Sequence, residues 1–202
     1  LQTALADCIA TLREQGLALH PSINLGGMTV LAGEDAAIAA AMERLPKVGT
    51  RYPMRLVNHA AFHTPLLERI SQEARGIFSA NIFRRPCLPL VDGRGGVWRP
   101  FESATAGLCD YTFSTQVTST YDFTAAIRVA AREFAPDIFI VLGPGDTLGG
   151  AVAQSLIAIN WRRLSSKSDF TSRQSKTPLL ISLGRPEQRM QVINESRARE
   201  IA

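Results

Sequence analysis

The stretch that most constrains the fold is a short apolar run that leads directly into a tight turn and then a helix. Residues 137–142 are DIFIVL, and Gly143-Pro144-Gly145 follows at once. A continuous apolar run of this length, closed by a turn, is typical of a strand buried on both faces. Residues 122–134 and 147–159 have helical apolar spacing on either side of it. A helix, a strand, a turn and a helix in this order predict a parallel α/β sheet.

The segment before residue 60 predicts a smaller unit of a different kind. Apolar spacing and turn residues predict a helix over 2–15, two strands over 17–23 and 28–32, a helix from residue 35 that Pro46 ends, and a strand over 52–57. This order matches a ferredoxin-like unit without its first strand. We therefore divide the chain into a ferredoxin-like small subdomain over residues 1–60, part of an α/β core over 61–160, and a basic peripheral extension over 161–202.

Charge and composition exclude several classes of function. The 202 residues hold 22 lysines and arginines against 18 acidic residues, but residues 161–202 contain nine of the former and four of the latter. The rest of the chain is close to neutral, so no nucleic-acid partner is predicted. No apolar run approaches the ~18 residues of a membrane span, so no membrane association is predicted. Three widely spaced cysteines, Cys8, Cys87 and Cys109, favour a reduced, cytoplasmic protein.

Histidines are the main candidates for chemistry. His59 and His63 are four residues apart, but Ala60 stands where a zinc protease needs Glu, so no metal site is predicted. His63 precedes Thr64-Pro65, a helix-start signal, and the junction of a strand with a helix is where α/β sites gather. On spacing alone His63 is either structural or catalytic. The chain contains no Gly-x-Ser-x-Gly pentapeptide, so it lacks a recognisable serine nucleophile.

Three motifs, in order, resemble the malonyl-CoA:acyl-carrier-protein transacylases and the related polyketide-type acyltransferase domains. They are Ser22-Ile23-Asn24 leading to residues 30–33, the segment Ala61-Phe62-His63-Thr64-Pro65-Leu66, and residues 140–145 with Leu148. The resemblance runs from about residue 17 to residue 160. It implies an α/β-hydrolase-like core, present here in part, with an inserted ferredoxin-like subdomain.

The resemblance also implies a mechanism and a set of site residues. A serine takes malonyl from coenzyme A and passes it to the phosphopantetheine thiol of acyl carrier protein, with His63 as base and then acid. The backbone carbonyl of Gln116 would hold the imidazole in one tautomer. Asn24, Ala61 and Phe62 would line the substrate pocket, and the Ala61-Phe62 pair matches the malonyl-selective form. The expected partners are acyl carrier protein and the substrate malonyl-CoA, with no permanently bound cofactor, in fatty acid or polyketide biosynthesis.

Several family residues have no counterpart among these 202. The family's nucleophilic serine, its oxyanion-hole glutamine and its carboxylate-binding arginine all precede the position of Leu1, and Met28 replaces a glutamine. We therefore expect the chain to be the C-terminal portion of an acyl-carrier-protein S-malonyltransferase-like enzyme. Its N-terminal half would be cut away or encoded as a separate chain. The alternative is a non-catalytic acyltransferase-like fragment that binds or scaffolds a partner.

Overall fold

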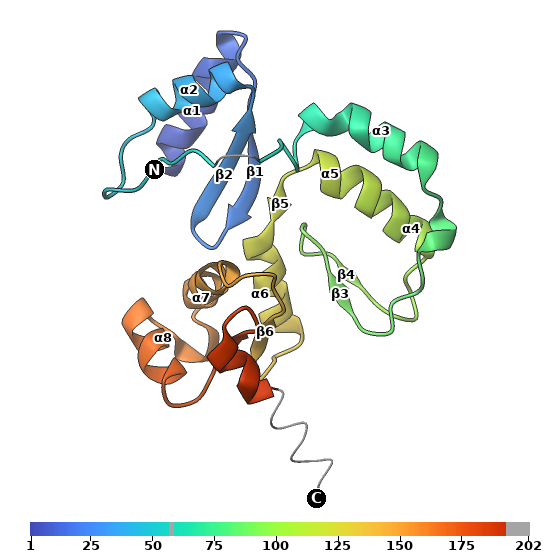
Figure 1. Ribbon diagram of the computed structural model, residues 1–202, viewed down its shortest axis with the longest axis vertical. Helices are drawn as coiled ribbons and strands as arrows, with labels where there is room; N and C mark the ends of the chain where they lie inside the picture. The colour runs from blue at the N-terminus through green and yellow to red at the C-terminus, as the bar shows by residue number, and fades with distance from the viewer. Residues whose placement is uncertain (57–58, 193–202) are drawn as a thin grey trace, which may run out of the picture. The chain divides into compact units, whose positions relative to one another are not determined.

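The computed structural model describes residues 1–56 and 59–192, which form two compact units (Figure 1). Unit 1 contains residues 1–24, 29–93 and 97–122. Unit 2 contains, among the described residues, 25–28, 94–96 and 123–192. No helix in the described part is long and apolar enough to cross a membrane.

The first part of unit 1 is a hairpin packed with two helices. Helices α1 (Gln2–Glu14) and α2 (Asp35–Arg44) flank the strands β1 (Leu19–Leu25) and β2 (Met28–Gly33) in the chain. Buried side chains of α1, β1 and α2 form one core, made of Cys8, Leu12, Leu19, Ala37 and Ala41. Small alanines on α2 let it approach closely. The predicted helix, two strands and second helix are confirmed.

A third strand joins this hairpin from far along the chain. Strand β5 (Tyr121–Asp122) pairs in parallel with β1, with Ile23 opposite Tyr121 and Asn24 opposite Asp122. The resulting sheet has the order β2-β1-β5. This pairing brings the chain around residue 121 to the strand that carries Ser22 and Asn24.

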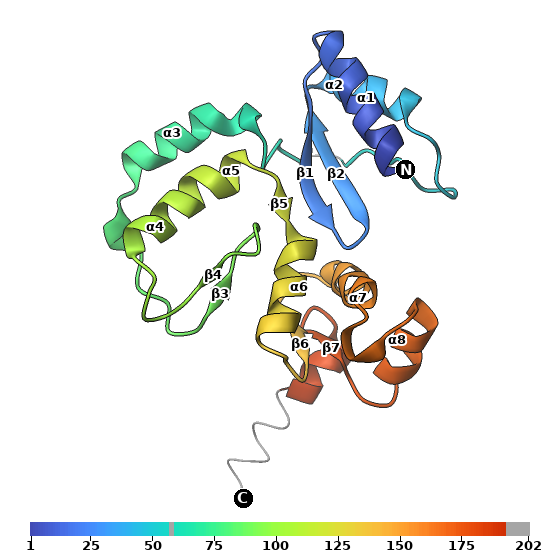
Figure 2. The ribbon, with the colours of Figure 1, turned by 180° about the vertical axis from the view of Figure 1, so that it is seen from behind.

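The second part of unit 1 consists of two packed helical segments and a short hairpin. A 3₁₀ turn η1 (Pro65–Leu67) leads into α3 (Glu68–Ile77), and a turn η2 (Ala80–Ile82) follows. Strands β3 (Leu90–Val91) and β4 (Val97–Trp98) pair antiparallel. Helix α4 (Thr105–Asp110) then continues through a π-helical stretch η3 (Tyr111–Thr115) into α5 (Gln116–Thr118). Figure 2 shows α3 running alongside this composite helix.

Unit 2 is a small parallel α/β arrangement. Its elements are α6 (Phe123–Glu133), β6 (Phe139–Val141), α7 (Leu148–Ala158), η4 (Trp161–Arg163), α8 (Lys167–Gln174) and β7 (Leu180–Ser182). Strands β6 and β7 are parallel, with Phe139 opposite Leu180. Buried apolar residues from the helices and β7 form its core: Ala131, Val152, Leu156, Trp161, Leu164, Leu179 and Leu180. The predicted helix, strand, turn and helix are confirmed, as is the parallel pairing.

The strand predicted over residues 52–57 is wrong for the described residues 52–56. They form no strand, and the local pairing is an isolated bridge between Val48 and Tyr52. Pro53 lacks the N–H that a strand ladder needs, and the apolar side chains of Met54 and Leu56 are exposed. Residue 57 lies outside the described residues. Since β1 pairs instead with β5, the five elements expected for a ferredoxin-like unit are not assembled from residues 1–60.

The predicted boundaries at residues 60 and 160 also differ from the two units. Residues 161–182 are not peripheral, because Trp161, Leu164 and Leu180 are buried and β7 pairs with β6. Residues 193–202, the end of the predicted extension, lie outside the described part. Among the described residues, the basic side chains of this segment therefore belong to a folded part of unit 2.

A close approach at the hairpin turn gives a test of the packing in unit 2. A Cβ on Gly26 would overlap the backbone of Ala151 in α7, whereas one on Gly27 would meet nothing within 4 Å. Both glycines have positive φ. We expect Gly27→Ala to lower the free energy of unfolding by about 1–2 kcal/mol. Gly26→Ala should lower it by about 1–3 kcal/mol more, because the clash is added. Urea unfolding of both variants measures the difference, and equal losses would contradict the close approach.

Candidate functional site

His63 occupies an unusual backbone conformation at the start of the η1 turn. Its φ is +62°, in the left-handed region that non-glycine residues seldom adopt. Such a conformation costs about 1–3 kcal/mol and persists where the surroundings fix it. The backbone N–H of His63 donates to the carbonyl of Val117 at 2.9 Å. One end of the segment is thereby tied to α5.

The imidazole of His63 is bound through one nitrogen. Its Nδ1 lies 2.5 Å from the backbone carbonyl oxygen of Gln116. A carbonyl oxygen can only accept, so this contact places the proton on Nδ1. In the neutral ring Nε2 then carries a lone pair, and no hydrogen-bond partner for Nε2 is found among the described residues. The structure thus places His63 and Gln116 in the contact that the resemblance implies, and their catalytic roles stay predictions.

The two backbone carbonyls that accept hydrogen bonds from His63 come from the end of a helix, α5. The last four carbonyls of a helix have no partner within it. Here the carbonyl of Thr115 accepts from the N–H of Ser119 at 2.9 Å, and that of Ser114 from the Thr118 hydroxyl at 3.1 Å. The next two carbonyls, of Gln116 and Val117, accept from the ring and the backbone of His63. His63 therefore caps the helix end, and the helix end fixes His63.

Two hydroxyl groups hold the residues beside His63. Ser22 on β1, only 4% exposed, donates to the carbonyl of Phe62 at 2.8 Å. The fully buried Thr64 donates to the carbonyl of Ala61 at 2.7 Å. The carbonyls of Ala61 and Phe62 are thus satisfied by buried donors, which limits the freedom of the chain next to His63.

The remaining predicted site residues lie in different surroundings. Phe62 is 53% exposed, with its ring centroid 6.3 Å from that of His63, and Ala61 directly precedes it. Asn24 lies on β1, where its amide donates to the Asp122 carboxylate at 3.3 Å. Ala61 and Phe62 are therefore next to His63, whereas the Asn24 side chain contacts β5. Their role in substrate binding stays a prediction.

Sequence reasoning missed Tyr121 and the groups behind it. The Tyr121 ring lies 5.2 Å from the His63 ring, centroid to centroid. Burial raises the pKa of the Tyr121 phenol, and the neighbouring Tyr111 and Asp92 raise it further. The signal available in the sequence was an aromatic residue just before the Asp122 helix start. No local sequence signal indicated that the segment around Tyr121 pairs with β1, so the position of Tyr121 beside His63 could not be predicted.

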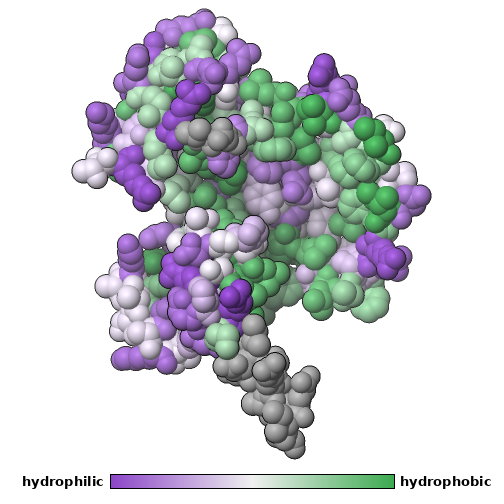
Figure 3. Space-filling model, viewed as in Figure 1, coloured by the Kyte–Doolittle hydropathy of each residue, from purple (hydrophilic) through white to green (hydrophobic). Residues whose placement is uncertain are grey.

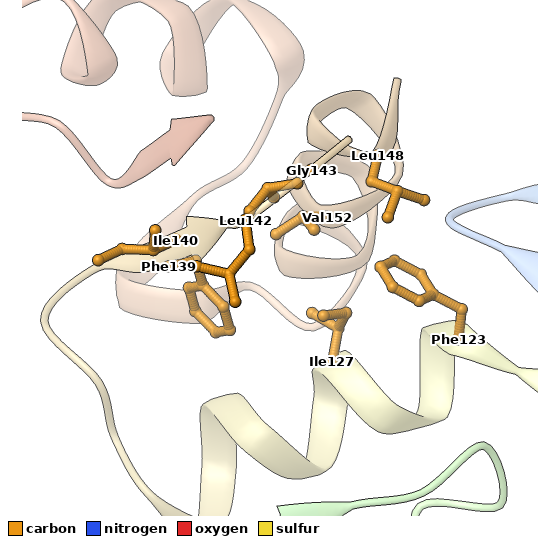
Figure 4. A pocket seen from close by; sticks show the side chains of 9 residues that line it. Phe123, Ile127, Phe139, Ile140, Leu142, Gly143, Leu148 and Val152 are labelled. Atoms are coloured by element: carbon orange, nitrogen blue, oxygen red, sulfur yellow. The ribbon is translucent and has the colours of Figure 1, made fainter. Parts of the chain in front are cut away.

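A second feature is an apolar cavity in unit 2, shown in Figure 4. It has a volume of about 240 Å³, and Phe123 and Ile127 of α6 point toward Leu148 and Val152 of α7 within it. The end of β6 and Gly143 complete its lining. The cavity presents no charged side chain. Among the described residues, no group of three or more His, Cys, Asp or Glu is placed to hold a metal ion.

Comparison with known proteins gives a sequence relative and a structural neighbour. No protein-family model matches the chain. The chain is 31% identical over 140 residues to phenolphthiocerol synthesis polyketide synthase type I Pks15/1 of Mycobacterium marinum, which covers 67% of this chain and 6% of that protein. A crystal structure of acyl-carrier-protein S-malonyltransferase from Burkholderia pseudomallei 1710b matches 96% of the chain with a TM-score of 0.70 and 19% identity. The chain has that mixed α/β fold. It spans 55% of the length of the malonyltransferase and a small fraction of the synthase.

The raised pKa of Tyr121 predicts a dependence of stability on alkaline pH. A phenol whose pKa is higher in the folded protein than in the unfolded chain stabilises the fold below pH ~10, and this contribution is lost as the pH rises through the folded pKa. We expect the free energy of unfolding of the wild type to fall more steeply between about pH 8 and 11 than that of Tyr121→Phe, which cannot ionise. Urea titrations at both pH values measure the two slopes. If the free energy of unfolding fell equally in the wild type and in Tyr121→Phe, the pKa of the Tyr121 phenol would not be raised by folding.

Proposed function

We propose that the chain is the C-terminal portion of a cytoplasmic acyltransferase. It would move a malonyl or similar short acyl group from coenzyme A to the phosphopantetheine thiol of acyl carrier protein. The observation that carries the proposal is His63, whose Nδ1 contacts the Gln116 carbonyl while Nε2 has no hydrogen-bond partner among the described residues. The similarity to a malonyltransferase fold and to a polyketide synthase sequence supports the same reaction class.

The proposed reaction has two half-reactions that share one base. A serine hydroxyl attacks the thioester carbonyl of malonyl-CoA while His63 Nε2 takes its proton. The C–S bond then breaks, and the protonated ring returns that proton to the coenzyme A thiolate. In the second half-reaction the phosphopantetheine thiol attacks the acyl-serine ester, gives its proton to Nε2, and the serine oxygen leaves with that proton. A positioned base of this kind contributes typically 10²–10⁴-fold to the rate.

The serine of this scheme must lie outside the 202 residues, which contain no Gly-x-Ser-x-Gly segment. The exposed apolar surface of unit 2 supports further polypeptide there. Among the described residues, β6 pairs with β7 alone, so this parallel sheet has two strands. The faces of a parallel sheet are normally both covered by other elements of the fold. Leu142 is 77% exposed and Ile140 44% exposed at the end of this strand. Figure 3 shows that apolar side chains reach the surface in both units. We propose that a serine-bearing segment, in the same chain or a separate one, covers this face.

The acyl group is proposed to be malonyl. Phe62 lies directly before His63, and its ring would occupy the space that an α-methyl group on the substrate requires. One methyl group in a pocket changes affinity by about 1–3 kcal/mol. The Ala61-Phe62 pair therefore favours malonyl over methylmalonyl without excluding the larger group.

The second candidate function is a non-catalytic fragment that binds or scaffolds a partner. It is favoured by the lack of a nucleophile within the 202 residues. Under this proposal the segment around His63 would only stabilise the helix end. The two functions differ in whether Nε2 of His63 takes part in chemistry.

The decisive experiment replaces His63 in the protein that carries the proposed serine segment. We expect His63→Ala to lower transfer of the malonyl group from malonyl-CoA to acyl carrier protein by about 10²–10⁴-fold, because the general base is lost. Transfer is measured as formation of malonyl-acyl carrier protein by mass spectrometry. Near-full transfer by this variant would refute the catalytic role.

Two matched variants serve as controls. Gln116→Ala keeps the backbone carbonyl that binds Nδ1, so transfer should stay close to the wild-type rate. His59→Ala removes a histidine four residues away from His63 and should also leave transfer unchanged. A large loss in either would mean that the assay reports folding rather than the base. Absence of transfer in the wild type would favour the scaffold function.

A further inference from the structure

We infer that Tyr121, backed by the turn at Asp92 and Gly93, is a positioning residue that holds the His63 ring against the Gln116 carbonyl. The catalytic consequence of this inference rests on the proposed function. The structural statement does not, because it concerns the orientation and tautomer of one imidazole ring.

A single hydrogen bond leaves the orientation of the His63 ring undetermined. The Nδ1 contact with Gln116 fixes one point of the ring, and the ring can still tilt about it. Two aromatic rings lie beside it. The Phe62 ring is 6.3 Å away and more than half exposed, whereas the half-buried Tyr121 ring is closer, at 5.2 Å with an interplanar angle of 49°. Tyr121 is therefore the neighbour that is both near and constrained.

Tyr121 is itself held in place by Gly93. The backbone N–H of Asp122 donates to the carbonyl of Gly93 at 2.6 Å. A Cβ on Gly93 would overlap Cγ, Cδ2 and Cε2 of the Tyr121 ring. The φ of Gly93 is not positive, so it is the space taken by the ring, and not the backbone conformation, that requires glycine here. The Tyr121 ring thus packs against the main chain of Gly93, with no space between them for a side chain.

Gly93 is fixed in turn by the helix that supplies the Gln116 carbonyl. The N–H of Gly93 donates to the Tyr111 hydroxyl at 2.7 Å in a buried hydrogen bond, and Tyr111 lies on η3. Asp92, 5% exposed, accepts from Trp98 Nε1 at 3.1 Å. The Trp98 ring packs 5.9 Å from that of Tyr111. The contacts therefore close into a loop: one helix presents the acceptor for Nδ1 and, through Tyr111 and Gly93, also supports the ring that faces His63.

The test uses ¹⁵N NMR of the imidazole nitrogens in the 202-residue chain, which has three histidines. The shifts of Nδ1 and Nε2 report the tautomer directly. We expect the wild type to show a single Nδ1–H tautomer for His63. In Tyr121→Leu, which removes the ring, and in Gly93→Ala, which displaces it, both shifts should move toward values averaged over the two tautomers. Tyr121→Phe keeps the ring and should keep the wild-type shifts.

Matched controls separate positioning from general destabilisation. Tyr52→Leu removes another partly exposed tyrosine of unit 1, and Gly76→Ala adds a Cβ that meets nothing within 4 Å. Both should leave the His63 shifts unchanged. Should Tyr121→Leu or Gly93→Ala fail to fold, Tyr111→Phe keeps the Tyr111 ring, removes the hydroxyl that accepts from Gly93 and should give a smaller shift in the same direction.

Two outcomes would overturn the inference. One is a folded Tyr121→Leu or Gly93→Ala protein, or a folded Tyr111→Phe protein, whose His63 shifts match the wild type. The other is a Tyr121→Phe protein that shifts as much as Tyr121→Leu, which would assign the effect to the hydroxyl. In the complete acyltransferase we expect Tyr121→Leu to lower kcat by about 10- to 100-fold with little change in KM. If the wild type transfers no acyl group, the NMR result still stands, so failure of the proposed function and failure of this inference are distinguishable.

Discussion

The structure of unit 1 depends on the meeting of a helix end with a left-handed histidine. The carbonyls of Gln116 and Val117 need donors because α5 stops at Thr118, and His63 supplies both donors. Without this contact, the two carbonyls of the helix end would lack donors and the two N–H groups of His63 would lack acceptors. The backbone strain at His63 and the unfilled acceptors at the helix end each cost free energy alone, and a single arrangement relieves both. A π-helical stretch lies just before Gln116, and such stretches are rare and occur frequently at functional sites.

This meeting requires chain segments that are distant in sequence. His63 and Gln116 are brought together by α3 packing along η3, where the fully buried Ser71 donates to the carbonyl of Phe113 at 2.7 Å. Strand β5 then returns the chain to β1, so that Ser22 and Tyr121 approach the histidine turn from one sheet. The site is therefore a property of the helix pair and the sheet together. A substitution that weakens the packing of α3 would therefore alter the position of His63 even if it replaced no residue next to His63.

Sequence patterns predicted the elements whose cause is local. The apolar spacing in α1, the Gly26-Gly27 turn and the run before Gly143 each act within a few residues, and all three gave the observed structure. The strand predicted over 52–57 does not form in its described residues 52–56, because strand pairing depends on a partner and the second edge of β1 pairs with β5. The burial of Trp161 and Leu164 was missed for a related reason. A polar, basic segment can still bury a few apolar side chains when a strand such as β7 adds to a sheet. The position of His63 beside Gln116 followed from the family resemblance, whereas Tyr121 needed the long-range pairing and could not be predicted.

The hydrogen bonding of the His63 turn bears on the choice between a catalytic and a purely structural segment. The carbonyls of Ala61 and Phe62 accept from buried hydroxyls, and the N–H and Nδ1 of His63 both have acceptors. A segment that only capped a helix could use another side-chain donor at position 63, and an asparagine would adopt the left-handed conformation more readily. What imidazole adds is a second nitrogen on the far side of the ring. Nε2 lacks a protein hydrogen-bond partner among the described residues, whereas Nδ1 and the backbone N–H of His63 both have one. Fixing one nitrogen so thoroughly while leaving the other able to accept a proton is the arrangement that a general base requires.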